Sequence, residues 1–276
     1  MWKPNTNTDL ALFTARATIL GVLDRGLFQD VERFCLLIGC GHSGSTLVST
    51  VINAHPEIVM GHETDILRYV RPGVTRNTVF TVILQRDRQF TAAGRRWNGI
   101  DYSMPGSDQG SFSRLRVIGD KCIAKQAMRF HHDQRLLDLL RSKMNIPLRV
   151  IHLVRNPFDN IASIAPKQEL SYRIKKYREV TKAIDDIRSR LTAEELYELR
   201  YEDVVADPRR SLSDVCECLG LDASEEYLQH CGQLIRPSTR ASRFSVEWTA
   251  SQKYEVEAMI AARSVLADYA FGIDQS

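Results

Sequence analysis

Residues 34–46, with the sequence FCLLIGCGHSGST, constrain the fold more than any other segment of the chain. The apolar run at 34–38 contains no proline and leads into a glycine, which predicts a buried parallel strand. A loop with three glycines follows, and the next residues, LVSTVI, suit a helix. A strand, a glycine loop and a helix N-terminus direct backbone N–H groups at one point. The segment therefore predicts an anion site, most often one for phosphate.

Two known motifs overlap in this loop. Gly39, Gly41 and Gly44 match the dinucleotide fingerprint G-x-G-x-x-G, and Glu63 follows at the spacing of its ribose-binding acid. The same loop matches the phosphate loop G-x-x-x-x-G-K-[ST], except that Ser45 replaces the lysine. In nucleoside triphosphatases that lysine binds the β- and γ-phosphates, and a separate acidic residue binds Mg²⁺. The replacement of this lysine by Ser45 favours a donor that carries less phosphate charge and needs no metal.

The composition is that of an ordinary globular protein. With 276 residues, 43% of them hydrophobic and 26% charged, we expect a single α/β domain over residues 1–276. A net charge of +3 suits an anionic small molecule and is too weak to indicate nucleic acid. No signal peptide and no run long enough for a membrane span are visible. The six cysteines lack zinc spacing, so reduced thiols and a cytoplasmic location are expected.

Strand-like and helix-like segments alternate along the chain. After the first strand we expect short strands at 58–61, 116–119, 148–154 and 197–200. Helices are expected at 9–25, 76–93, 125–143, 157–165, 169–191, 208–219 and 249–269, and one long polar loop at 98–113. Such alternation predicts a central parallel sheet flanked by helices. Ligands bind at the carboxyl ends of such strands, where Glu63, Lys121 and Arg155 follow.

Four segments resemble the sulfotransferases that use 3′-phosphoadenosine 5′-phosphosulfate (PAPS). GCGHSGSTLVSTVINAHPEI and the following GHETDI resemble their 5′-phosphosulfate loop, and VIHLVRNPFDNIAS resembles their 3′-phosphate motif. VIGDK resembles a strand that ends in lysine, and ELRYEDVV resembles a segment with a tyrosine near the adenine. The matches follow the order of the family from about residue 34 to 221. HPEIVMGHET is most similar to the tyrosylprotein sulfotransferases, which are membrane-anchored, whereas no anchor is visible here.

The resemblance implies a P-loop-like sulfotransferase fold, PAPS as the donor, no metal, and a small-molecule or glycan acceptor with a hydroxyl or amine. It implies that Glu63 is the acceptor base and that Lys121, with His42, stabilises the leaving oxygen. The family usually has arginine or lysine at the place of His42 and threonine at the place of Ser45. The residues implied to bind the donor are Gly41, His42, Ser43, Gly44, Ser45, Thr46, Arg155, Ser163 and Tyr201.

Several of these residues also have a structural explanation. The glycine loop can be a simple turn, Glu63 a helix cap, Lys121 a solvated lysine at a strand end, and Tyr201 a core aromatic. Arg236, Arg240 and Arg243 form a basic segment that either covers the nucleotide or is a solvated loop. Three other functions also remain open: an ATP-dependent phosphate-loop kinase, a Rossmann oxidoreductase, and a nucleotide-binding protein without activity.

Overall fold

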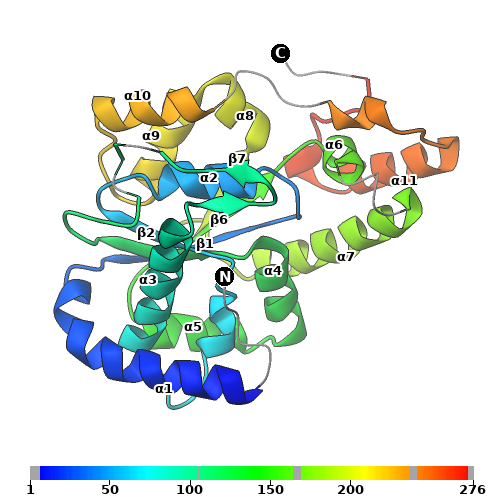
Figure 1. Cartoon of the computed structure of the whole chain (residues 1–276). Coiled ribbons are helices and arrows are strands. Elements are labelled where there is room, and N and C mark those ends of the chain that lie inside the picture. The colour runs from blue at the N-terminus through cyan, green and yellow to red at the C-terminus, as the bar shows by residue number, and fades with distance from the viewer. Residues whose placement is uncertain (1–6, 105, 108, 164–168, 236–240, 273–276) are drawn as a thin grey trace.

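The computed structural model describes residues 7–104, 106–107, 109–163, 169–235 and 241–272, which are arranged around a central sheet (Figure 1). Five parallel strands form this sheet in the order β2-β5-β1-β6-β7. They are β1 (Arg33–Gly39), β2 (Ile58–His62), β5 (Val117–Lys121), β6 (Leu148–Val154) and β7 (Leu196–Arg200). The sheet confirms the α/β fold with parallel strands that the sequence predicts.

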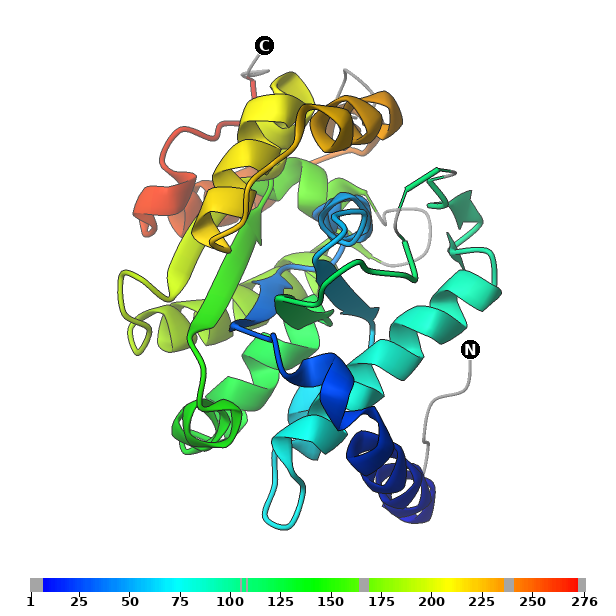
Figure 2. The ribbon, with the colours of Figure 1, turned by 90° about the vertical axis from the view of Figure 1, so that its left-hand side faces the viewer.

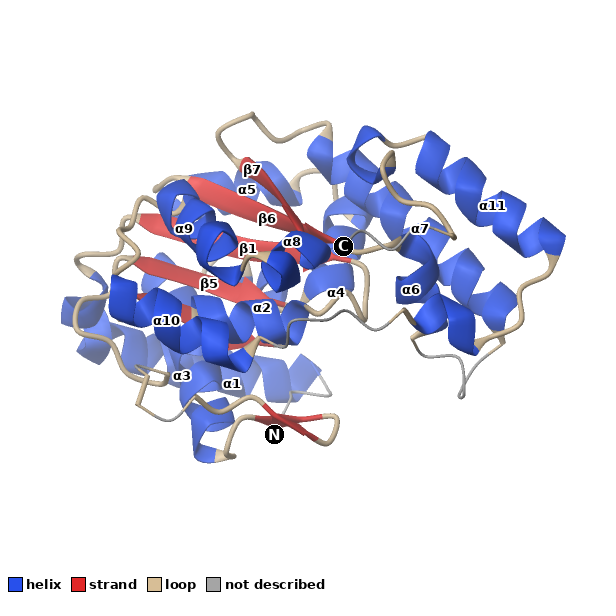
Figure 3. Cartoon of the chain, turned by 90° about the horizontal axis from the view of Figure 1, so that it is seen from above, coloured by secondary structure: helices blue, strands red, loops and turns tan. Residues whose placement is uncertain are grey.

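Helices cover both faces of the sheet (Figures 1 and 3). One face is covered by α1 (Asn7–Leu23), α3 (Arg76–Ala92), α4 (Ile123–His132), α5 (Leu136–Met144) and α7 (Leu170–Arg188). The other carries α2 (Ser45–Ile52), α8 (Tyr201–Ala206), α9 (Pro208–Cys218) and α10 (Glu225–Leu234). Two further helices, α6 (Pro157–Ala162) and α11 (Ala250–Ala261), lie with part of α7 beyond one end of the sheet (Figure 3). Turned by a quarter, the molecule shows α1, in dark blue, against α3 (Figure 2).

Strand β1 explains why the chain needs a continuous apolar run at 34–38. Phe34, Leu36 and Ile38 pack into the hydrophobic cluster on one face of the sheet. Cys35 and Leu37 alternate with them and pack into the cluster on the opposite face. All five side chains are fully buried, and a strand with both faces covered has no solvent-facing position for a polar residue. Each large side chain buried in this way contributes roughly 1.5–3 kcal/mol.

Several expected elements differ from those observed, and the helix expected at 249–269 ends at Ala261. The helix expected at 125–143 is divided into α4 and α5, because Asp133 leaves the helical conformation and its carboxylate accepts a hydrogen bond from the Arg135 N–H (3.1 Å). The expected loop at 98–113 begins with a hairpin of β3 (Arg96–Trp97) and β4 (Ile100–Asp101). Its turn consists of Asn98 and Gly99, both with positive φ, which is the Asn-Gly signal for a two-residue hairpin.

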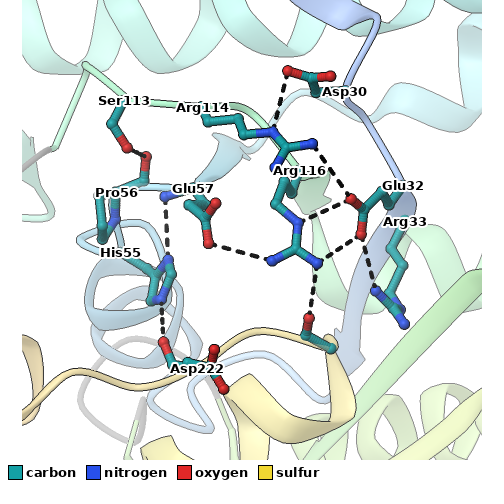
Figure 4. Close-up of polar contacts among 11 residues, drawn as sticks. Asp30, Glu32, Arg33, His55, Pro56, Glu57, Ser113, Arg114, Arg116 and Asp222 are labelled. Atoms are coloured by element: carbon teal, nitrogen blue, oxygen red, sulfur yellow. Dashed lines mark hydrogen bonds and ion pairs between the residues drawn. The ribbon is translucent and has the colours of Figure 1, made fainter.

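A group of charged residues joins segments at the amino ends of three neighbouring strands, opposite the loop (Figure 4). The Arg116 guanidinium, next to β5, donates two hydrogen bonds to Glu32 (3.0 and 2.7 Å) before β1. It also contacts Glu57 (3.5 Å) before β2 and donates to the Gly220 carbonyl (3.2 Å) after α9. This arginine lowers the pKa of the Glu32 carboxyl through their hydrogen bonds. The group is therefore a structural connection distant from the carboxyl edge of the sheet.

We expect Arg116→Ala to lower the free energy of unfolding by about 1–2 kcal/mol, because it removes charged hydrogen bonds to three segments at once. The measurement is urea unfolding. Arg114→Ala is the matched control, since Arg114 is half exposed and pairs with Asp30 at 3.2 Å; it should change stability by less than about 0.5 kcal/mol. Equal losses in the two variants would contradict the structural role assigned to Arg116.

Candidate active site

The glycine loop connects β1 to α2 at the carboxyl edge of the sheet. Helix α2 begins at Ser45, so the first N–H groups of the helix have no carbonyl partner within it. Gly44 precedes it with a left-handed backbone (φ 85°). The Ser43 hydroxyl is buried and has no hydrogen-bond partner among the described residues. Unpaired donors that converge on one loop are the geometry of an oxyanion cradle.

The aromatic ring of Tyr201 packs directly against this loop. A Cβ atom added at Gly44 would lie 2.1 Å from a ring carbon of Tyr201, so only glycine fits there. The Arg155 guanidinium lies over the same ring, 5.2 Å from its centroid, and donates a hydrogen bond to the His42 carbonyl (3.1 Å). Loop, tyrosine and arginine thus form one unit, although the loop is more than 100 residues from the other two in the chain.

Glu63 and Lys121 meet because their strands are neighbours in register. His62 of β2 pairs with Lys121 of β5, and the following Glu63 N–H donates to the Lys121 carbonyl (2.8 Å). The Lys121 ammonium binds the Glu63 carboxylate (2.8 Å) and the Thr46 hydroxyl (3.1 Å). The lysine side chain is 3% exposed and that of Glu63 17%. One buried cation therefore links a carboxylate that faces partly to solvent with the first turn of α2.

A second carboxylate, Asp120, holds the backbone around Glu63. Glu63 and Asp65 both have positive φ (53° and 59°), a conformation that costs energy for residues other than glycine. Asp120 accepts hydrogen bonds from the N–H groups of Thr64 (3.1 Å) and Ile66 (3.0 Å) on either side of Asp65. Burial raises the pKa of Asp120 to about 6. Asp120 is thus a positioning residue that the sequence did not single out, although it directly precedes Lys121.

His42 lies in the loop with a left-handed backbone (φ 67°). Although His42 is exposed at the surface, partial desolvation by the surrounding protein lowers the pKa of its imidazole, and the charges of Arg173, Arg155 and Lys121 lower it further. The neutral ring is therefore the favoured form near neutral pH in the ligand-free protein. His42 differs in this respect from the arginine or lysine that the resemblance leads one to expect, because a neutral imidazole carries no permanent charge.

The remaining expected donor-binding residues lie around α6. Arg155 precedes this helix and Ser163 follows it, where the Ser163 hydroxyl donates to the Asn160 carbonyl (2.8 Å). Of the basic segment, Arg236 and Arg240 lie outside the described residues. Arg243 is buried and forms an ion pair with Asp159, so it connects two parts of the protein and does not form a solvated loop.

Some observations on the described residues bear on ligands and compartment. In that part of the chain no three His, Cys, Asp or Glu side chains are grouped closely enough to hold a metal ion. Among the described helices none has the length and apolar character needed to cross a membrane. All six cysteines are free thiols.

Comparison with known proteins gives one family and several related folds. A sequence profile of the Sulfotransferase family matches residues 35–225. The sulfotransferase domain of the olefin synthase from Synechococcus PCC 7002 superposes with a TM-score of 0.55 at 17% identity, over 90% of this chain and 97% of that one. The sulfotransferase domain from the curacin biosynthetic pathway gives 0.50 at 15% identity, over 84% and 96%. Sulfotransferase STF1 from Mycobacterium tuberculosis gives 0.50 at 13% identity, over 90% and 82%. No curated protein sequence matches significantly.

Proposed function

The chain belongs to the sulfotransferase family, and we propose that it transfers a sulfuryl group from PAPS to a hydroxyl or amine of a small-molecule or glycan acceptor. The observation that carries this proposal is the position of the Lys121 ammonium, which binds both Glu63 and the Thr46 hydroxyl. A candidate base and a candidate oxyanion cradle are thereby joined through one cation. That is the arrangement required when a proton is removed on one side of a transferring group and negative charge develops on the other.

In the proposed reaction the acceptor oxygen or nitrogen forms a bond to sulfur while the bond from sulfur to the 5′-phosphate oxygen breaks. Glu63 takes the proton of the acceptor. Lys121 and the N–H groups of Ser43–Thr46 stabilise the charge on the departing oxygen, so the products are a sulfated acceptor and adenosine 3′,5′-bisphosphate. His42 contributes a hydrogen bond. Ser45, in place of the phosphate-loop lysine, suits a phosphosulfate better than a triphosphate.

Arg155 and Ser163 are the proposed ligands of the 3′-phosphate, and Tyr201 the proposed contact of the adenosine. Support comes from the Arg155 guanidinium, which contacts both the His42 carbonyl of the loop and the ring of Tyr201. Ser163 ends the helix that Arg155 precedes, so both flank one short element. Arginine suits phosphate because its planar fork donates two parallel hydrogen bonds.

The test is calorimetric titration with adenosine 3′,5′-bisphosphate in the presence of EDTA, since the proposed site needs no metal. Arg155→Ala should weaken binding by about 1.5–3 kcal/mol, the range of a charged hydrogen bond. Arg114→Ala, which removes one positive charge at the opposite edge of the sheet, should leave the affinity unchanged. If adenosine 5′-monophosphate binds the parent protein equally well, no 3′-phosphate is recognised and the assignment fails.

His42 provides a pH-dependent prediction. Its pKa is depressed in the ligand-free protein, and a bound anion would raise it, so binding should take up a proton. The affinity of the parent relative to His42→Asn should therefore increase by about two- to tenfold from about pH 7.5 to about pH 5.5. Asparagine is chosen because it tolerates the left-handed backbone. Titrations in buffers of different ionisation enthalpy measure the proton uptake, and parallel pH profiles for parent and variant would argue against this role.

We further propose that residues 1–276 form one domain in a reducing, cytoplasmic compartment. Both hydrophobic clusters pack on the same five-stranded sheet, which supports one folding unit. The six unpaired thiols support a reducing environment.

A further inference from the structure

A cavity lies beside the glycine loop, and one of its lining residues is a buried arginine with no carboxylate partner among the described residues. The cavity, of about 140 Å³, lies between loop residues Gly41 and His42 on one side and α6 and α7 on the other. Arg173, on the first turn of α7, lines it and is only 5% exposed. The sequence gives no sign of this role, because an arginine within a helix rich in charged residues carries no distinguishing signal.

The hydrogen-bonding capacity of Arg173 is largely unused. Its Nη2 donates to the Asn160 carbonyl (3.2 Å), while its Nε and Nη1 are buried without a partner in the part of the chain that the structure describes. Among the described residues no carboxylate pairs with it, and burial alone lowers its pKa to about 10. A buried charge that lacks a counter-charge is unfavourable, and buried polar groups are normally satisfied. Such a guanidinium is well suited to an anion that enters the cavity.

The surroundings of Arg173 also favour an anion. Its charge is the largest electrostatic contribution to the lowered pKa of His42, ahead of those of Arg155 and Lys121, so the three cations act on the same loop. Lys176, one turn along α7, lines the cavity too, but its ammonium is half exposed and binds Glu179. Arg173 is therefore the buried charge at this place, and Lys176 is a natural control.

We propose that Arg173 and His42 form an oxyanion subsite that binds a sulfuryl, phosphate or other tetrahedral anion beside the glycine loop. This subsite adds a binding residue to the proposed active site, and its role in catalysis rests on the proposed function. The anion has two possible sources: the sulfuryl or phosphate group of the donor, or a separate anionic group on the acceptor. In either case Arg173 supplies the permanent charge that His42 lacks.

The experiment compares the parent with Arg173→Gln, Arg173→Lys and Lys176→Gln in calorimetric titrations. The ligands are PAPS without acceptor, adenosine 3′,5′-bisphosphate, and inorganic sulfate added to the protein alone or saturated with the bisphosphate. Arg173→Gln should weaken at least one of these by about tenfold or more, as expected for a lost charged hydrogen bond. Arg173→Lys should keep part of the affinity that Arg173→Gln loses. Lys176→Gln should change the affinity of the parent by less than about twofold.

Each source gives its own pattern. If Arg173→Gln loses affinity for PAPS but not for the bisphosphate, the anion is the sulfuryl group. If it loses affinity equally for both, the anion is a phosphate that both ligands carry. A loss confined to inorganic sulfate assigns it to the acceptor. Unchanged binding of all ligands, or equal effects of Lys176→Gln, would overturn the subsite.

Two controls complete the experiment. Because Arg173→Gln removes a buried charge that has no carboxylate partner among the described residues, its melting temperature without ligand should equal or exceed that of the parent. A clear decrease would assign a structural role to Arg173 and also overturn the subsite. If the parent binds sulfate in an Arg173-dependent way but binds neither nucleotide, the proposed function fails while the subsite stands.

Discussion

Replacing Glu63 with glutamine is expected to lower turnover by about 10²–10⁴-fold, while the affinity for adenosine 3′,5′-bisphosphate stays within about twofold. Glutamine keeps the shape and a hydrogen-bonding oxygen toward the Lys121 ammonium, which lies 2.8 Å from the native carboxylate. It cannot accept the proton of the acceptor. The loss should therefore appear in the chemical step and not in donor binding.

The measurement is a single-turnover assay with radiolabelled donor and an acceptor found by screening with the same label. Glu57→Gln is the matched control, since Glu57 immediately precedes β2 and lies at the opposite end of that strand from Glu63. It should retain parent turnover. Near-normal turnover in Glu63→Gln would show that a different group is the base. His62 is then the nearest alternative along the chain, although its ring is buried and stacked on Phe90.

The contact between Glu63 and Lys121 was only partly predictable from the sequence. Each residue follows an apolar strand, so its place at the carboxyl edge of the sheet was predictable. Their direct contact was not, because it depends on β2 and β5 being neighbours with His62 opposite Lys121. Strand order is decided by packing between segments distant in the chain, which the local pattern does not encode.

Arg173 and Asp120 could not be predicted for a related reason. The role of Arg173 depends on the absence of a paired carboxylate among the described residues. The role of Asp120 depends on two backbone N–H groups that donate to its carboxylate. Both are properties of a three-dimensional environment, not of residue type or spacing. The hairpin at Asn98 and Gly99 is the opposite case, since the Asn-Gly pair is a local signal that predicts this turn.

The second large effect is expected for Lys121→Met, which should lower turnover by about 10²–10³-fold because charge on the departing oxygen loses its counter-charge. Lys121→Met should also destabilise the protein by about 2–4 kcal/mol, since it leaves a largely buried carboxylate without its cation. Part of this loss is offset because Glu63 Oε2 still contacts the Cys122 thiol (3.6 Å). Urea unfolding and single-turnover assays on the same preparation measure the two effects.

The double variant Glu63→Gln with Lys121→Met separates stability from chemistry. It removes both charges of the pair, so the free energy of unfolding should return to within about 1 kcal/mol of the parent value. Turnover should remain as low as in the poorer single variant, because neither the base nor the counter-charge is present. If restoring stability also restored turnover, the inactivity of Lys121→Met would reflect misfolding alone. Lys121 would then hold Glu63 in place without acting on the leaving group.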